Sequence, residues 1–217
     1  MIRAAAWISA GYCGVVANGA SRRLRVPDLS STTDMTELVG QPPKYYPRMT
    51  SEARQSFCAA SLAMQASRWT LSDYQEIGMV AAGYAGCIDA DRRYFGDYVS
   101  NGRMLGRGNL FIYTLPTSTL GEIAIALKLA GPTLHIQSDS RPVQGLLQNA
   151  WSLVVGGEAV GVLAIWSDLE AAICFAVGHD SSDGPDISSL LRERLESSPM
   201  ELAKSLDAMI NTELQKP

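Results

Sequence analysis

The segment 121–151 constrains the fold more than any other, because it alternates helix and strand within a short length of chain. A helical pattern ends at Gly131-Pro132, a short strand is predicted over 133–137, and a second helix is predicted over 143–156. Ser140 is placed to cap that second helix, since a serine there accepts hydrogen bonds from free backbone N–H groups. Helices that alternate with strands in this way predict a layered α/β fold.

The remainder of the chain continues this alternation. Strands are predicted over 4–17, 77–86, 159–166 and 170–178, and helices over 51–68, 90–100, 119–130, 186–196 and 199–214. The segment 18–50 lacks periodicity and contains four prolines, so we expect a long surface excursion there. We divide the chain into a domain over 1–180, layered α-β-α around a mixed five-stranded sheet, and a C-terminal helical tail over 181–217.

The composition excludes several classes of function. The 217 residues are 47% hydrophobic, enough for one substantial core, and the net charge of −4 argues against nucleic-acid binding. No stretch is long and apolar enough to span a membrane, and the start of the chain fits a buried strand better than a signal peptide. We therefore expect a cytoplasmic protein. The four cysteines and two histidines lack metal-ligand spacing, so we expect no metal and no cofactor.

The turn Ser138-Asp139-Ser140 is the segment best placed to carry chemistry. It puts Ser140 at a helix N-terminus, where peptide dipoles favour negative charge and where many acyl-transfer enzymes hold a nucleophilic cysteine. A serine hydroxyl is far less acidic than a thiol, so Ser140 would need an adjacent base. The residues next to Ser140 in the sequence do not supply such a base, because His135 lies within the preceding predicted strand. A helix cap is the simpler interpretation, and an acyl-accepting serine is the alternative.

Several short segments around this turn occur in a recognisable order. They are Asn109-Leu110-Phe111, Thr114-Leu115-Pro116, Gly121-Glu122-Ile123-Ala124, Leu129-Ala130-Gly131-Pro132 and 153–165. Together they resemble the N-terminal half of the β-ketoacyl synthases, which are members of the thiolase-like superfamily. The upstream segments 57–66 and 79–86 fit the helix and strand that come earlier in that half. The resemblance covers roughly residues 1–180, and its central part is the most specific.

The resemblance implies a departure at the reactive position. Counting from Gly131-Pro132, the cysteine of the family falls at Ser140. In the complete enzymes the histidines that drive decarboxylation come from the second half of a duplicated fold, which these residues do not include. We therefore expect neither the nucleophile nor the catalytic base. The family also forms dimers through the strand before the nucleophile, so the expected docking edge consists of Thr133, Leu134, His135, Ile136 and Gln137.

Chain-length factors are members of the family that keep the fold, lose the cysteine and pair with an active ketosynthase. The chain resembles a shortened subunit of this type, so we expect a non-catalytic pseudoenzyme of a fatty-acid or polyketide-type pathway. The expected partners are a second copy or a full-length ketosynthase, and an acyl-carrier protein. The candidate substrate contacts are Phe111, Tyr113, Leu115 and Arg141. Two alternatives stay open: an acyltransferase or hydrolase that uses Ser140 or Cys87, and a homodimeric scaffold that binds no acyl group.

Overall fold

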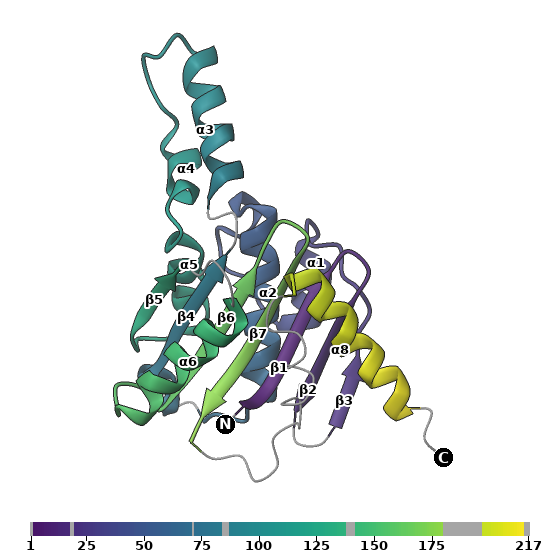
Figure 1. Cartoon of the computed structure of the whole chain (residues 1–217). Coiled ribbons are helices and arrows are strands. Elements are labelled where there is room, and N and C mark those ends of the chain that lie inside the picture. Colours follow the sequence, from purple (N-terminus) through teal and green to yellow (C-terminus); the bar gives the residue numbers. More distant parts are fainter. Residues whose placement is uncertain are drawn as a thin grey trace.

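A seven-stranded mixed sheet organises the chain, with the strand order β3-β2-β1-β7-β6-β4-β5. The computed structural model describes residues 2–17, 20–70, 72–83, 87–137, 142–179 and 197–214. The strands are β1 (Ile2–Ser9), β2 (Cys13–Ala17), β3 (Ala20–Arg23), β4 (Ile77–Gly83), β5 (Thr133–Ile136), β6 (Gly161–Ser167) and β7 (Ala171–Gly178). In Figure 1 the sheet runs across the molecule from β5 on the left to β3 on the right.

The strand directions divide the sheet into two parts. β4 lies parallel to both β5 and β6, whereas β7 is antiparallel to β6 and to β1. Every residue of β6 and β7 is buried, and their near-continuous apolar runs are typical of strands that are covered on both faces. The centre of the sheet is therefore the centre of the core.

Helix α2 (Ser51–Ala66) covers one face of the sheet and lies behind it in Figure 1. Eleven of its sixteen residues are buried, because α1 (Thr32–Val39) and α5 (Ser118–Leu127) pack against it from outside. Thr50 caps the helix, since its hydroxyl oxygen accepts a hydrogen bond from the Ala53 N–H at 3.2 Å. This cap fixes where α2 begins, beside the ends of β4 and β6.

Two helices cover the opposite face. α6 (Pro142–Val155) packs on β4 and β6, and α8 (Pro199–Leu214) packs on β7, β1 and β3. Leu202, Leu206 and Ile210 of α8 are fully buried, as expected for an apolar stripe at helical spacing. An ion pair between Arg23 Nε and Asp207 Oδ1, at 3.4 Å, also ties this helix to the sheet edge.

An arm projects from the body of the molecule (Figure 1). It consists of α3 (Ile88–Ser100) and a returning segment that holds α4 (Gly108–Phe111) and the short 3₁₀ helix η3 (Ile112–Thr114). No residue of α3 is buried, and the arm exposes large apolar side chains. These are Ile88, Phe95, Val99, Met104, Leu105, Phe111 and Ile112.

The structure confirms the layered α/β class and differs from the sequence-based prediction in two details. Residues 4–17, expected as one strand, form the hairpin β1-β2, and β3 extends it, so the sheet has seven strands rather than five. The Ser9 hydroxyl accepts the Tyr12 N–H at 3.0 Å and closes the turn. β2 therefore begins at Cys13, shortly after β1 ends at Ser9, and its apolar side chains join the same core.

The segment 18–50 contains more regular structure than its lack of periodicity predicts. It holds β3, α1 and the 3₁₀ helix η1 (Tyr46–Arg48), and Met35, Tyr46 and Met49 are buried within it. The Tyr46 hydroxyl donates to the Leu29 carbonyl at 2.8 Å within the segment, and the Tyr46 ring packs against Phe57 of α2 with centroids 5.9 Å apart. A further short 3₁₀ helix, η2 (Asp73–Glu76), leads into β4. The helix predicted over 186–196 lies outside the described residues.

Candidate functional site

Two of the predicted site residues lie outside the described part of the chain. Ser140 and Arg141 belong to the segment 138–141, between β5 and the start of α6. The described elements on either side have the expected order, with a strand before the segment and a helix after it.

The predicted docking strand is at the edge of the sheet. β5 pairs with β4 on one side and ends the strand order on the other. Thr133 and Leu134 are exposed, as is Gln137 just beyond the strand, whereas His135 and Ile136 are half-buried. The residues expected to meet a partner therefore form an accessible edge.

The three residues expected to wall an acyl tunnel do not share a surface. Phe111 and Leu115 are about half exposed, at 48% and 50%, on the outside of the arm and its base. Tyr113 points inward and is 7% exposed, and its hydroxyl lies 3.4 Å from Glu122 Oε1. Burial and this carboxylate raise the pKa of Tyr113 to about 12. Only Tyr113 contributes to the pocket below.

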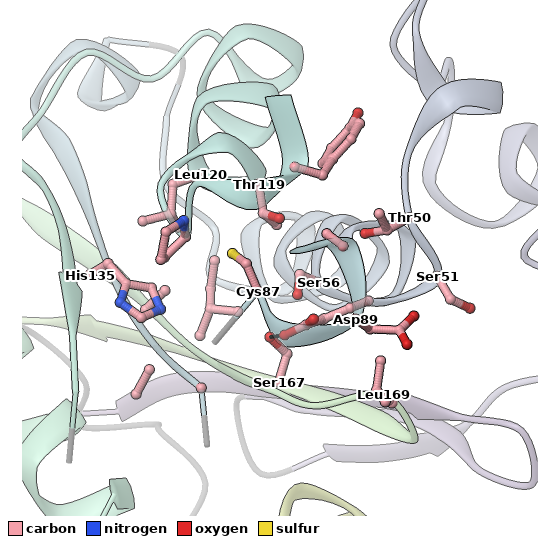
Figure 2. Close-up of a pocket in the computed structure, with 18 of the residues that line it drawn as sticks. Thr50, Ser51, Ser56, Cys87, Asp89, Thr119, Leu120, His135, Ser167 and Leu169 are labelled. Carbon is pink, nitrogen blue, oxygen red and sulfur yellow. Dashed lines mark hydrogen bonds between the residues drawn. The ribbon is translucent and has the colours of Figure 1, made fainter. Parts of the chain in front are cut away.

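A partly open pocket of about 70 Å³ lies where β4 and β6 end and α2 begins. Figure 2 shows Ser56, Cys87, Thr119, His135 and Ser167 around it, drawn from five different elements and their flanking turns. Because β4, β5 and β6 are parallel, their carboxyl ends meet at one edge, and the helices that follow or face them close the space. A space of this size holds several water molecules, by comparison with about 10–15 Å³ for one.

Glu52 is the principal acid of the pocket. It stands in the first turn of α2, and Ser167 of β6 donates a hydrogen bond to its Oε1 at 3.4 Å. Burial is the largest influence and raises the pKa of Glu52 to about 7, while the Ser167 bond opposes the shift and the neighbouring Asp168 and Asp89 add to it. The carboxyl group is therefore divided between its neutral and ionised forms near neutral pH.

Ser56 lies one helical turn beyond Glu52 on α2. Its side chain is 1% exposed, lines the pocket, and its Oγ has no hydrogen-bond partner among the described residues. A buried hydroxyl left unsatisfied costs about 1–3 kcal/mol, so such groups are normally paired with protein, water or ligand. The Ser56 hydroxyl can therefore form a hydrogen bond with a water or ligand in this pocket.

The Cys87 thiol lines the same pocket, and its environment does not activate it. Burial, Glu52 and Asp91 raise its pKa to about 11, in that order of size. His135, the nearby imidazole, has its pKa lowered by burial, so it does not supply a cation that would stabilise a thiolate. This disfavours the alternative in which Cys87 is a nucleophile.

The other cysteines, Cys13, Cys58 and Cys174, are free and buried. Among the described residues no cluster of three or more histidine, cysteine or acidic side chains could hold a metal ion. Within that same part of the chain no single helix is long and apolar enough to cross a membrane, although the bent pair Gly108–Thr114 and Ser118–Leu127 meets the length and composition limits together.

The sequence marks Glu52 only as a helix-start charge and does not single out Ser56. The available signal was an acid and a serine four residues apart on one helix, a spacing that places both on one face. That face becomes a pocket only because Ser167 and Cys87, distant in sequence, meet it in space.

Comparison with known proteins identifies similar solved structures. No family model matches the chain, and no curated protein matches its sequence. The ishigamide ketosynthase/chain length factor superposes with a TM-score of 0.60 at 16% identity, over 85% of this chain and 63% of that one. The ketosynthase ApeO in complex with its chain length factor ApeC, from Xenorhabdus doucetiae, gives 0.52 at 13% identity, over 81% and 78%. AntDE:AntF, a type II acyl-carrier protein in complex with its ketosynthase, gives 0.53 at 12% identity, over 89% and 65%.

The chain has the ketosynthase and chain-length-factor fold. This confirms the fold that the segments around 109–165 led us to expect. At these identities the likeness extends to the fold and not to the chemistry of individual residues. The chain spans about 63% of the length of the ishigamide structure.

Proposed function

We propose that this chain is a non-catalytic, ketosynthase-like partner subunit, similar in role to a chain-length factor, in fatty-acid or polyketide-type biosynthesis in the cytoplasm. The observation that supports it most is the fold shared with ketosynthase and chain-length-factor structures. The described pocket adds support, because its thiol and imidazole are both held in their neutral forms by burial. These groups do not form the activated pair that acyl transfer requires.

The proposed docking edge is β5 with Gln137. An edge strand has unpaired backbone N–H and C=O groups, and a second sheet can extend it by strand pairing. Leu134 is 40% exposed on this edge and supplies an apolar contact. The occupant is a full-length ketosynthase or a second copy of this chain, and an acyl-carrier protein is the expected third component.

The experiment mixes the purified chain with a ketosynthase encoded beside it and measures the mass of the complex by light scattering. Leu134→Arg places a charge on the edge and is expected to weaken association at least tenfold, equivalent to about 1.4 kcal/mol. Tyr45→Arg is the matched control, since Tyr45 is 48% exposed beside η1 and is not part of β5. A complex that Leu134→Arg leaves intact would contradict docking through β5.

The same preparation tests the catalytic alternative. Ser140 stands between β5 and α6, so an acyl adduct on the chain after incubation with acyl-CoA or acyl-carrier protein would favour an enzyme. Loss of that adduct in Ser140→Ala would establish the serine as the acceptor and overturn the non-catalytic role. We expect no adduct by intact-mass spectrometry. A homodimer that binds neither ketosynthase nor acyl group would instead favour the scaffold alternative.

A further inference from the structure

The pocket beside α2 combines an apolar wall, which includes Ala81, Leu120 and Ile165, with a group of polar side chains. Glu52, Ser56 and Ser167 present a carboxyl and two hydroxyl groups to a space of about 70 Å³. The Ser56 Oγ is buried without a partner among the described residues, so the pocket has an unused hydrogen-bonding group. A polar cavity that is roomy enough and lined by such groups is occupied by water or by a ligand that replaces it.

The charges that face Glu52 give the pocket a negative field. Asp168, at the turn between β6 and β7, and Asp89, on α3, both disfavour ionisation of Glu52. Arg93 also lines the pocket, but its guanidinium pairs with the Asp89 carboxylate at 3.0 Å. The charges of Arg93 and Asp89 therefore largely cancel each other. The Cys87 thiol is protonated, and His135, on β5, is kept neutral by burial. An ionised Glu52 therefore has no cation of its own in the described pocket.

We propose that this pocket binds a small ammonium group, held by the Glu52 carboxylate and by the Ser56 and Ser167 hydroxyl oxygens. An alkylammonium ion carries three N–H donors on one nitrogen, which matches three converging acceptors. Its positive charge replaces the missing partner of Glu52, and charge-assisted hydrogen bonds of this kind are about twice as strong as neutral ones. The site is argued independently of the proposed partner role, because its three ligand groups lie on α2 and β6, and none of them lies on β5 or at Ser140.

The chemistry predicts a pH dependence of known sign. Ammonium binds the ionised form of Glu52, whose pKa is raised to about 7 in the free protein, so binding releases a proton below that pH. Affinity should rise about tenfold between about pH 6 and about pH 8, because the ionised fraction of the carboxyl rises by that factor. The alkylammonium ion itself stays protonated throughout this range.

The test titrates the full chain with methylammonium and ethylammonium chloride and follows binding by calorimetry and by amide chemical shifts. Acetate, methanol and potassium chloride at equal ionic strength are the control probes. We expect alkylammonium binding that tightens with pH, that falls at least tenfold in Glu52→Gln, and that weakens in Ser56→Ala. Glu158→Gln, at an exposed acid outside the pocket, should bind as the unchanged protein does.

Four outcomes would overturn the proposal. They are no alkylammonium binding, an equal response to potassium, preferential binding of acetate, and an affinity that does not change with pH. Circular dichroism of each variant separates loss of binding from loss of folding. If Glu52→Gln unfolds, the unchanged protein is measured by calorimetry in two buffers of different ionisation enthalpy. Proton release on alkylammonium binding below about pH 7 is then the expected result, and its absence would contradict the role of Glu52. None of these outcomes depends on the association test with Leu134→Arg.

Discussion

Glu52 is the residue whose properties depend most on its surroundings. An exposed glutamate in the first turn of a helix is stabilised in its ionised form by the helix dipole. Here burial outweighs the dipole and the Ser167 hydrogen bond, and the pKa rises from the ordinary 4.5 to about 7. The folded protein therefore holds a proton on Glu52 more tightly than the unfolded chain does.

This shift makes stability depend on pH. The contribution of Glu52 is fully present below the unfolded pKa and is lost as the pH rises through about 7, because the folded state must then ionise a buried acid. Glu52→Gln removes the titration, so we expect this variant to gain about 1–3 kcal/mol relative to the unchanged protein between acid and alkaline pH. Urea unfolding at several pH values measures the difference.

The control for this prediction is Glu158→Gln. Glu158 is exposed after α6, so its replacement should change the free energy of unfolding by less than about 0.5 kcal/mol. A pH profile that is the same for Glu52→Gln and the unchanged protein would contradict the assigned protonation of Glu52.

At the scale of elements, the junction between α5 and β5 decides how the docking strand joins the sheet. α5 ends at Leu127 because Lys128 adopts a left-handed conformation with φ 58°, before the predicted end at Gly131-Pro132. Gly131 then passes close to β4, and the Pro132 carbonyl accepts the Met79 N–H at 2.7 Å. The sequence locates this bend, and the packing explains why a glycine occupies it.

Gly131→Ala should destabilise the protein. A Cβ at this position would lie 2.6 Å from the Gly78 nitrogen, a backbone atom that cannot move without disturbing β4. We expect a loss of about 1–3 kcal/mol in the free energy of unfolding. The matched control is Gly121→Ala within α5, where nothing lies within 4 Å and alanine should instead add about 0.5–1 kcal/mol. Thermal unfolding measures both, and equal effects would contradict the close approach.

At the scale of the whole molecule, α8 extends the core that α6 begins. The two helices cover the same face of the sheet, α6 toward β4 and α8 toward β1 and β3 (Figure 1). The central strands beneath them are apolar on both faces. The face under α6 and α8 must therefore be shielded from water, just as the face under α2 is. The tail expected from the sequence as a separate helical region is, over 199–214, part of the sheet packing.

Leu206→Ala should show how much the fold depends on this helix. Leu206 is fully buried, and truncating such a side chain costs about 2–5 kcal/mol through lost burial and the cavity that remains. Lys204→Ala on the exposed side of the same helix is the control and should change the free energy of unfolding by less than about 0.5 kcal/mol. Hydrogen exchange over β1 and β7 should become faster in Leu206→Ala alone. Unchanged exchange there would mean that α8 is not part of the cooperative core.

Local pattern in the sequence by itself determined the strands β4 to β7 and the helices α2, α3, α5 and α6, because apolar spacing, caps and Gly-Pro stops act over a few residues. It also determined the order of those elements, which agrees with the fold of the ketosynthase and chain-length-factor structures. It did not predict α4 or the 3₁₀ helices η2 and η3. The hairpin β1-β2, the helix α1 and the strand count depended on contacts with distant residues that no local pattern records. Only the tertiary structure decided the pocket, because the state of Glu52 depends on Ser167, separated from it by 115 positions, and on burial that exists only in the folded chain.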